Sequence, residues 1–200
     1  MERLGIYGGT FSPPHNGHVH AAKCFLEQMA LDRLIIVPTY IPPHKSRTDA
    51  VSAEMRFDMC KCAFGFSSQI EVSDMEIVRQ GKSYTAETLG ALTREGRKLF
   101  FLCGTDMLLT MDTWYKPEVI FALADIVCVR REEDVDVKTA LDEKANEYRM
   151  RFGARIHLLT VPSLTLSSSE VRAQIKEGGA WEQLLPSEVA AYINEKELYQ

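Results

Sequence analysis

The sequence predicts an α/β protein built on a doubly wound, mostly parallel sheet. Apolar runs rich in β-branched residues recur at regular intervals along the chain. Most of these runs are continuous rather than alternating with polar residues, which is typical of parallel strands covered on both faces. Helical patterns separate the runs, and this alternation favours right-handed crossovers within one open sheet.

Each predicted strand is short and apolar, and a helical or polar segment follows it. The predicted strands span residues 4–8, 34–37, 70–72, 99–103, 126–129 and 156–161. The predicted helices span residues 17–31, 52–64, 84–94, 137–151 and 168–176. Ser83 or Thr85 is a candidate cap of the third helix, Gly178-Gly179 closes the fifth, and Ser187 opens a further short helix.

Composition and charge place the chain among ordinary folded proteins. Of its 200 residues 46% are hydrophobic and 26% are charged, and we expect one domain over residues 1–200. The net charge of −5 argues against extended nucleic-acid binding. No apolar run approaches the roughly 20 residues that cross a bilayer, and Met1 leads into the first strand without a signal peptide. We therefore expect a cytoplasmic protein without membrane contact, and the sequence leaves open whether it forms a homo-oligomer.

A segment rich in glycine and histidine joins the first predicted strand to the first predicted helix. It reads Gly8-Gly9-Thr10-Phe11-Ser12-Pro13-Pro14-His15-Asn16-Gly17-His18. Ligands of open parallel sheets bind at the carboxyl ends of strands, and glycines let the backbone approach them closely. A helix start adds N–H groups and a positive dipole end. His15 and His18 are three residues apart and share one side of the first turn, so the segment predicts an anion site.

Other interpretations of this segment fit less well. It lacks the Gly-Lys-Ser/Thr of a P-loop and the third glycine of a dinucleotide fingerprint. A glycine pair alone is more often a plain turn. The paired histidines have no evident third ligand, so we predict no metal site in the protein.

The whole string resembles the signature of the nucleotidyltransferase superfamily with the (H/T)xGH motif. The resemblance implies a Rossmann-like nucleotidyltransferase fold, with ATP bound by this loop. In that family the positions that match His15 and His18 contact the ATP phosphates. The family usually has Asp where this chain has Ser12. The ATP-binding residues implied here are Gly8, Gly9, Thr10, Phe11, His15 and His18.

A second candidate phosphate-binding element follows the last predicted strand, in the helical part over about residues 165–200. It reads Leu166-Ser167-Ser168-Ser169-Glu170-Val171-Arg172 and resembles the family motif ISSTxxR. Serine hydroxyls and N–H groups at a helix start can bind phosphate, and an arginine can neutralise its oxygens. We therefore assign Ser167, Ser168, Ser169 and Arg172 to ATP binding. The alternative is an ordinary capped helix with an exposed arginine.

The middle of the chain resembles the bacterial nicotinate mononucleotide adenylyltransferases, and the similarity spans nearly the full length. It rests on Pro42-Pro43-His44-Lys45, on the segment 83–89, on Gly104-Thr105-Asp106 and on Trp114. The resemblance implies transfer of AMP from ATP to nicotinate mononucleotide, which gives nicotinate adenine dinucleotide (deamido-NAD) and pyrophosphate. Phosphopantetheine adenylyltransferase, which usually has Thr where His15 stands, and a non-catalytic nucleotide-binding regulatory module are the alternatives.

Four central residues are predicted to bind the acceptor. Trp114 would stack on the pyridine ring, Tyr84 or Thr85 would bind its carboxylate, and Lys45 would reach the phosphates of acceptor and ATP. Asp106 is assigned to the ATP site, as a partner of ribose hydroxyls or of an adenine-side amine. The alternatives are that Trp114 fills the core, Asp106 caps a helix and Lys45 is a solvated charge. Arg47 and Arg130 are weaker candidates for phosphate or ribose contacts.

The expected reaction is a direct in-line attack of the acceptor phosphate on the α-phosphorus of ATP. Catalysis would rest on positioning and on neutralising charge, and the catalytic groups would be His18, His15, Lys45 and Arg172. Mg²⁺ would arrive on the ATP phosphates, since the sequence offers no dedicated carboxylate cage.

Overall fold

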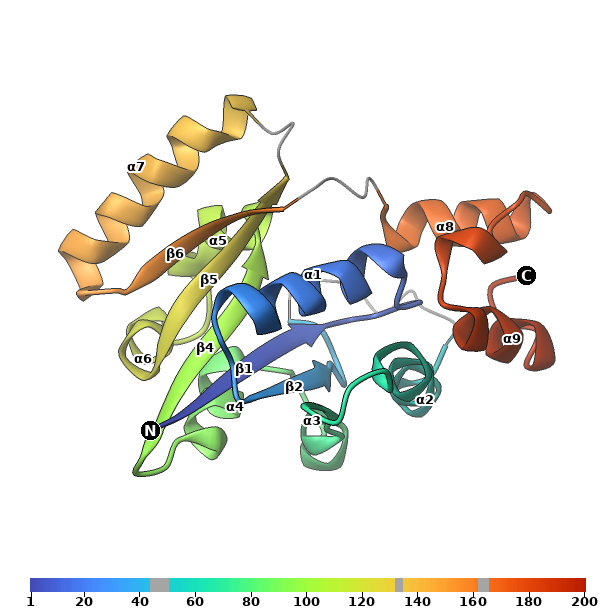
Figure 1. Cartoon of the computed structure of the whole chain (residues 1–200), viewed down its shortest axis with the longest axis horizontal. Coiled ribbons are helices and arrows are strands. Elements are labelled where there is room, and N and C mark those ends of the chain that lie inside the picture. Colours follow the sequence, from blue (N-terminus) through green and yellow to red (C-terminus); the bar gives the residue numbers. More distant parts are fainter. Residues whose placement is uncertain (44–50, 132–134, 162–165) are drawn as a thin grey trace. The chain divides into compact units, whose positions relative to one another are not determined.

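The computed structural model describes residues 1–43, 51–131, 135–161 and 166–200. It contains a six-stranded sheet with the strand order β3-β2-β1-β4-β5-β6 (Figure 1). The strands are β1 (Glu2–Gly9), β2 (Arg33–Pro38), β3 (Ile70–Val72), β4 (Arg97–Gly104), β5 (Ala124–Arg131) and β6 (Ile156–Val161). The pairings β1–β4, β4–β5 and β5–β6 are parallel. This is the order of a doubly wound sheet, so the predicted fold class is confirmed.

Helices connect the strands. They are α1 (Asn16–Gln28), α2 (Ala53–Phe64), α3 (Met75–Arg79), α4 (Thr85–Leu92), α5 (Thr105–Thr110), α6 (Pro117–Leu123), α7 (Val135–Phe152), α8 (Ser168–Lys176) and α9 (Ser187–Glu195), with 3-10 turns η1 (Met111–Thr113) and η2 (Glu182–Leu184). Every predicted helix is present, and α3, α5 and α6 were not predicted. In the described part of the chain, no helix has the length and apolar character needed to cross a membrane.

The described residues form two compact units, each assembled from distant parts of the chain. The first unit comprises Met1–Gly8, Cys24–Leu34 and Tyr84–Ser163, and the second comprises Gly9–Lys23, Ile35–Ser83 and Leu164–Gln200. The chain passes from one unit to the other several times, so neither unit is a consecutive stretch. The expectation of one domain over residues 1–200 stays a prediction.

In the first unit, α5 and α6 pack against β5, and α7 packs on both helices. The rings of Phe121 on α6 and Tyr148 on α7 lie 4.8 Å apart. Gly5 of β1 lies close to the chain that follows α1. A Cβ atom at Gly5 would lie 2.5 Å from the Leu31 side chain, so this close approach requires glycine. In the β1–β4 pairing Tyr7 lies opposite Leu102, which places the carboxyl ends of both strands at the same edge of the sheet.

In the second unit, α2 packs against α9 and β3. Ser52, the first residue of the predicted helix 52–64, is the cap of α2 and accepts a hydrogen bond from the Met55 N–H at 3.2 Å. Gly179 N–H donates to the carbonyl of Gln174 just beyond α8, and Gly178 has a φ of 68°, which confirms the predicted glycine stop.

The predicted cap of α4 is wrong. Tyr84 occupies the cap position without a side-chain hydrogen bond, and Thr85 is the first helical residue. The hydroxyl of Ser83 accepts a hydrogen bond from the N–H of Tyr40 at 2.9 Å instead. Ser83 therefore ties the segment after β2 to the segment before α4, which is a long-range contact that no local pattern indicates.

Candidate active site

The loop after β1 turns sharply at Phe11, whose φ of 49° lies in the left-handed region. The Phe11 ring folds back over Gly9, where an added Cβ atom would lie 2.9 Å from the ring. The same ring is buried and packs edge-on against Phe64 of α2, with 5.7 Å between the ring centres. The structure thus gives Gly9 a packing role, in addition to the ligand approach that the sequence suggested.

His15 and His18 lie together at the start of α1, as predicted. Their rings stack with 3.7 Å between centres, and His15 is only 5% exposed while His18 is partly buried. The backbone N–H of His15 donates to Nδ1 of His18 at 3.1 Å. Because Nδ1 accepts, a neutral His18 ring carries its proton on Nε2, which makes Nε2 a hydrogen-bond donor. A donor beside a helix start suits an anion.

The second motif opens α8 and contacts the loop after β1. Ser167 and Glu170 form a reciprocal capping box, which fixes the first turn of α8. The hydroxyl of Ser168 donates to the Pro13 carbonyl at 2.9 Å. Nη1 of Arg172 donates to the Ser12 carbonyl at 2.6 Å, and its Nη2 contacts the Ser169 hydroxyl at 3.3 Å. The two motifs, 155 and 160 residues apart at these contacts, are therefore joined within one unit.

Sequence reasoning missed two residues that hold the same loop. Arg56 of α2 is 4% exposed, and its guanidinium donates to the carbonyls of Thr10 at 2.7 Å, Thr39 at 2.6 Å and Tyr40 at 3.3 Å. It shares a buried helix face with Met59, which the three-residue spacing in the sequence could have indicated.

The second missed residue is Tyr199, whose hydroxyl lies 3.0 Å from the hydroxyl of Ser12. Both side chains are buried. No sequence signal marks this contact, because the two residues are 187 positions apart.

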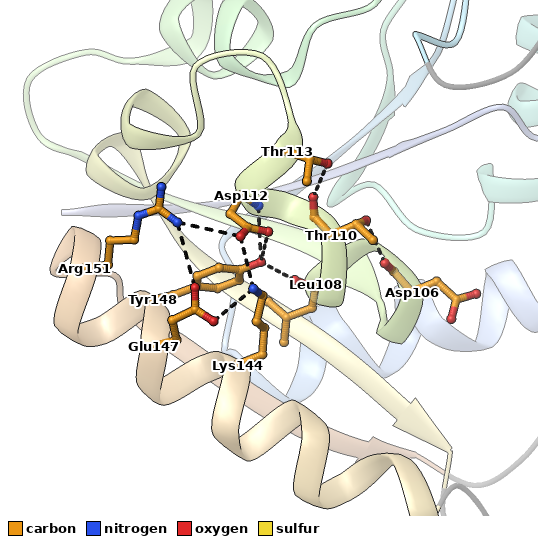
Figure 2. A network of polar contacts seen from close by, with 9 residues as sticks. All are labelled: Asp106, Leu108, Thr110, Asp112, Thr113, Lys144, Glu147, Tyr148 and Arg151. Carbon is orange, nitrogen blue, oxygen red and sulfur yellow. Dashed lines mark hydrogen bonds and ion pairs between the residues drawn. The ribbon is translucent and has the colours of Figure 1, made fainter.

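Asp106 lies in the first turn of α5, in the first unit. Its side chain is exposed, and Gly104 rather than Asp106 occupies the cap position, so the alternative of a helix cap is wrong. Figure 2 shows the Asp106 carboxylate pointing away from the polar network that joins α5 and η1 to α7. The residue is therefore held by the helix backbone with its carboxylate directed outward.

The network that supports α5 centres on the fully buried Tyr148 of α7. Its hydroxyl donates to the Leu108 carbonyl at 2.9 Å or to Asp112 Oδ1 at 3.0 Å, and it accepts from the Asp112 N–H at 3.2 Å (Figure 2). Burial raises the pKa of Tyr148 to about 12. Burial alone would raise the pKa of Asp112, but hydrogen bonds from Lys144 and Tyr148 lower it below its usual value.

The predicted acceptor residues Tyr84, Thr85 and Trp114 also belong to the first unit. Trp114 follows η1, is partly buried and meets Phe101 edge-on, with 6.4 Å between ring centres. The Tyr84 ring lies 4.3 Å from the ring of the exposed Tyr115. Trp114 and the tyrosines thus supply aromatic surface that a flat ring could contact.

The remaining predicted residues have other positions. Lys45 and Arg47 lie outside the described residues. Arg130 of β5 donates to the Thr160 hydroxyl of β6 at 3.0 Å. Gly8 and Asp106 belong to the first unit, whereas the two histidines and the second motif belong to the second. Among the described residues, no three His, Cys, Asp or Glu side chains are grouped to hold a metal ion.

Comparison with known proteins identifies relatives of the chain. Residues 6–174 match the cytidylyltransferase-like family. The chain is similar to a probable nicotinate-nucleotide adenylyltransferase of Desulfitobacterium hafniense, at 37% identity over 100% of this chain and 96% of the relative. It is also similar to one of Clostridium novyi, at 32% identity over 100% of both chains.

A solved structure shares the fold. The nicotinic acid mononucleotide adenylyltransferase of Plasmodium falciparum, complexed with NaAD, superposes with a TM-score of 0.77 at 17% identity, covering 100% of this chain and 98% of that chain. The family match and the full-length relatives together establish the membership of the chain. It belongs to the cytidylyltransferase-like family and, within it, to the nicotinate-nucleotide adenylyltransferases.

Proposed function

We propose that the chain transfers AMP from ATP to nicotinate mononucleotide and releases nicotinate adenine dinucleotide and pyrophosphate. The observation that carries this proposal is the pair of hydrogen bonds from Ser168 and Arg172 to the loop after β1. They bring two helix starts, two histidines and an arginine to one loop. The names of the full-length relatives support the acceptor.

The reaction is an in-line displacement. An oxygen of the acceptor 5′-phosphate forms a bond to the α-phosphorus of ATP while the bond from that phosphorus to the α,β-bridging oxygen breaks. The electron pair of the broken bond leaves with pyrophosphate. The acceptor phosphate is already anionic at neutral pH, so no side-chain nucleophile is required, and the protein contributes positioning and charge stabilisation.

Each of the predicted catalytic residues has a proposed role at the phosphates. Nε2 of His18 donates to an α-phosphate oxygen, since Nδ1 is occupied by the His15 N–H. His15 and the start of α1 bind the neighbouring phosphates, and Arg172 stabilises the departing pyrophosphate from α8. Lys45 is assigned to the acceptor and ATP phosphates through the sequence resemblance alone.

Mg²⁺ is proposed to bind as a complex with ATP. The described residues offer phosphate-binding donors rather than a group of carboxylates, which fits an ion that keeps the phosphate oxygens as ligands. When bound, the ion neutralises charge on those oxygens.

We also propose that the enzyme is cytoplasmic, because the net charge of −5 and the lack of a long apolar run fit an aqueous environment.

The acceptor is proposed to bind at α4 and η1. Trp114 and Tyr84 supply aromatic surface for the pyridine ring, while Thr85 and the N–H groups at the start of α4 face its carboxylate. Asp106, exposed in the first turn of α5, is proposed to accept hydrogen bonds from nucleotide hydroxyl or amino groups.

An acceptor panel tests the proposal. The full chain with ATP and Mg²⁺ is assayed for pyrophosphate release with nicotinate mononucleotide, nicotinamide mononucleotide or 4′-phosphopantetheine. We expect the highest kcat/KM with nicotinate mononucleotide and nicotinate adenine dinucleotide as the product by mass. Turnover only with 4′-phosphopantetheine would assign the other adenylyltransferase activity. ATP binding without pyrophosphate release for any acceptor would indicate a regulatory module instead.

A further inference from the structure

The segment after α9 returns to the loop after β1 and inserts a tyrosine beside it. The Tyr199 hydroxyl lies 3.0 Å from the Ser12 hydroxyl. Ser12 is 1% exposed and Tyr199 is 8% exposed, so this hydrogen bond is shielded from water. A shielded hydrogen bond is costly to break because each hydroxyl would lose its partner without gaining a water molecule.

The backbone around Tyr199 is held in an unusual conformation. Glu197 and Tyr199 have φ angles of 50° and 65°, in the left-handed region that non-glycine residues rarely adopt. Between them, Leu198 is buried and its N–H donates to the Ile193 carbonyl at 3.0 Å. Two residues in this region persist only where surrounding contacts fix the backbone, so Tyr199 is held firmly in place.

Ser12 is the point at which the two motifs meet. Its carbonyl accepts the hydrogen bond from Arg172, and the adjacent Pro13 carbonyl accepts the one from Ser168. The Ser12 side chain has Tyr199 as its partner. The residue is thus held on its backbone side by α8 and on its side-chain side by Tyr199, three positions before His15.

We propose that Tyr199 is a positioning residue for adenylyl transfer. By fixing Ser12, it sets the path of residues 12–15 and with it the placement of the stacked histidines and of Arg172 relative to the ATP phosphates. This inference rests on the proposed function. Tyr199 acts through Ser12 and touches no substrate, so its loss should affect the ATP side of the reaction and spare the acceptor side.

The direct test compares Tyr199→Phe with Tyr192→Phe. Tyr192 is a matched control because it lies on α9 in the same unit, and its hydroxyl contacts Asp58 of α2 at 3.4 Å rather than the loop. We expect Tyr199→Phe to lower kcat/KM for ATP about threefold to tenfold, the range of a single shielded hydrogen bond, and to leave the acceptor KM unchanged. Tyr192→Phe should match the wild type in both.

A double-mutant cycle separates positioning from general stability. Ser12→Ala and Tyr199→Phe remove the two ends of one hydrogen bond, so the double variant should lose no more kcat/KM for ATP than either single variant. Ser12→Thr keeps a hydroxyl and should retain more activity than Ser12→Ala. Melting temperatures of all variants report stability, and activity is measured well below them.

Several results would overturn the inference. Equal kinetics for the two tyrosine variants would do so, as would additive losses in the cycle or equal effects on both substrates. If the wild type transfers no AMP to any acceptor, the proposed function fails, and calorimetric binding of a non-hydrolysable ATP analogue replaces the kinetics. Tyr199→Phe should still weaken that binding about threefold to tenfold, and unchanged binding would refute the role of Tyr199 itself.

Discussion

His15 and His18 are joined by a hydrogen bond from the backbone of the first to the ring of the second, at 3.1 Å. Their rings also stack, and Phe11 meets His18 edge-on with 5.1 Å between ring centres. The orientation and the tautomer of His18 are therefore set by residues of the same loop. A donor at Nε2 is available without any proton transfer in the enzyme.

This geometry predicts different outcomes for two substitutions of His18. His18→Ala removes the donor, and kcat should fall about a hundredfold to a thousandfold, the loss typical of one donor to a developing anion. His18→Gln places an amide N–H near the position of Nε2 and should retain more activity. Steady-state kinetics with ATP and nicotinate mononucleotide measure both. Near-wild-type turnover in His18→Ala would contradict the assigned role.

Arg56 is predicted to stabilise the protein by holding the loop after β1. Arg56→Met leaves the carbonyls of Thr10 and Thr39 without this donor, and the free energy of unfolding should fall by about 1–3 kcal/mol. Arg56→Lys supplies a charge but cannot span both carbonyls as a planar fork does, so it should recover only part of the loss. Urea unfolding of the three proteins checks that the wild type is the most stable and that Arg56→Met is the least stable. The prediction fails if Arg56→Lys equals the wild type.

Trp114 is predicted to act on the acceptor alone. Trp114→Ala removes aromatic surface beside η1 and should raise the KM for nicotinate mononucleotide far more than the KM for ATP. Trp114→Phe keeps a ring and should restore much of the acceptor affinity. Initial rates over a grid of both substrates separate the two constants. Equal changes in both would indicate a purely structural role against Phe101.

The buried hydroxyl of Tyr148 is predicted to stabilise the first unit. Tyr148→Phe removes the hydrogen bonds to Leu108 and Asp112, and the free energy of unfolding should fall by about 1–3 kcal/mol. Lys138→Gln on the same helix is the control, since its ion pair with Asp142 is exposed and contributes little. Thermal melting of both variants tests this expectation, and a control that melts as early as Tyr148→Phe would refute it.

Glu2 is predicted to make the free energy of unfolding depend on pH. Hydrogen bonds from Arg97 and Arg94 lower its pKa from 4.5 to about 2. The folded state thus binds this proton more weakly than the unfolded state, so the stabilisation is complete above about pH 4.5 and is lost as the pH falls towards about 2.

The measurement is urea unfolding of the wild type and Glu2→Gln between neutral and acidic pH. The difference in unfolding free energy should be constant above the usual glutamate range and should shrink below it. Glu195→Gln is the control, because Glu195 is exposed and its ion pair with the neighbouring Lys196 lies at the surface, where such a pair contributes little. A difference that stays constant down to the lowest pH would contradict the assignment.

Most of the sheet could be predicted from sequence because the strands between its two edges, β2, β1, β4 and β5, contain runs of consecutive buried residues. The segments 70–72 and 156–161 match the observed strands, and the other predicted strands are extended by polar ends such as Arg97. The helices α3, α5 and α6 were missed because each is shorter than the window in which helical periodicity is visible. Pro117 in the first turn of α6 is a helix-start signal that could have revealed this helix in the sequence.

The residues of the loop after β1 could be singled out from the sequence, but the residues that support the loop could not. Glycines, histidines and capping serines carry local signatures, whereas Arg56 and Tyr199 act on the loop through contacts 46 and 187 residues distant in sequence. The spacing of Arg56 from Met59 can indicate a buried helix face but not the carbonyls that Arg56 contacts, and a tyrosine after the last helix resembles a surface residue in the sequence. Only the folded chain identifies their partners.

The Ser12–Tyr199 hydrogen bond also has a consequence for the order of synthesis. Chains are synthesised from the N-terminal side, so Ser12 is added before its partner, and 187 positions separate the two residues. While those positions are being added, the growing chain carries the loop without this hydrogen bond. Full nucleotide affinity would arise only once residue 199 is in place.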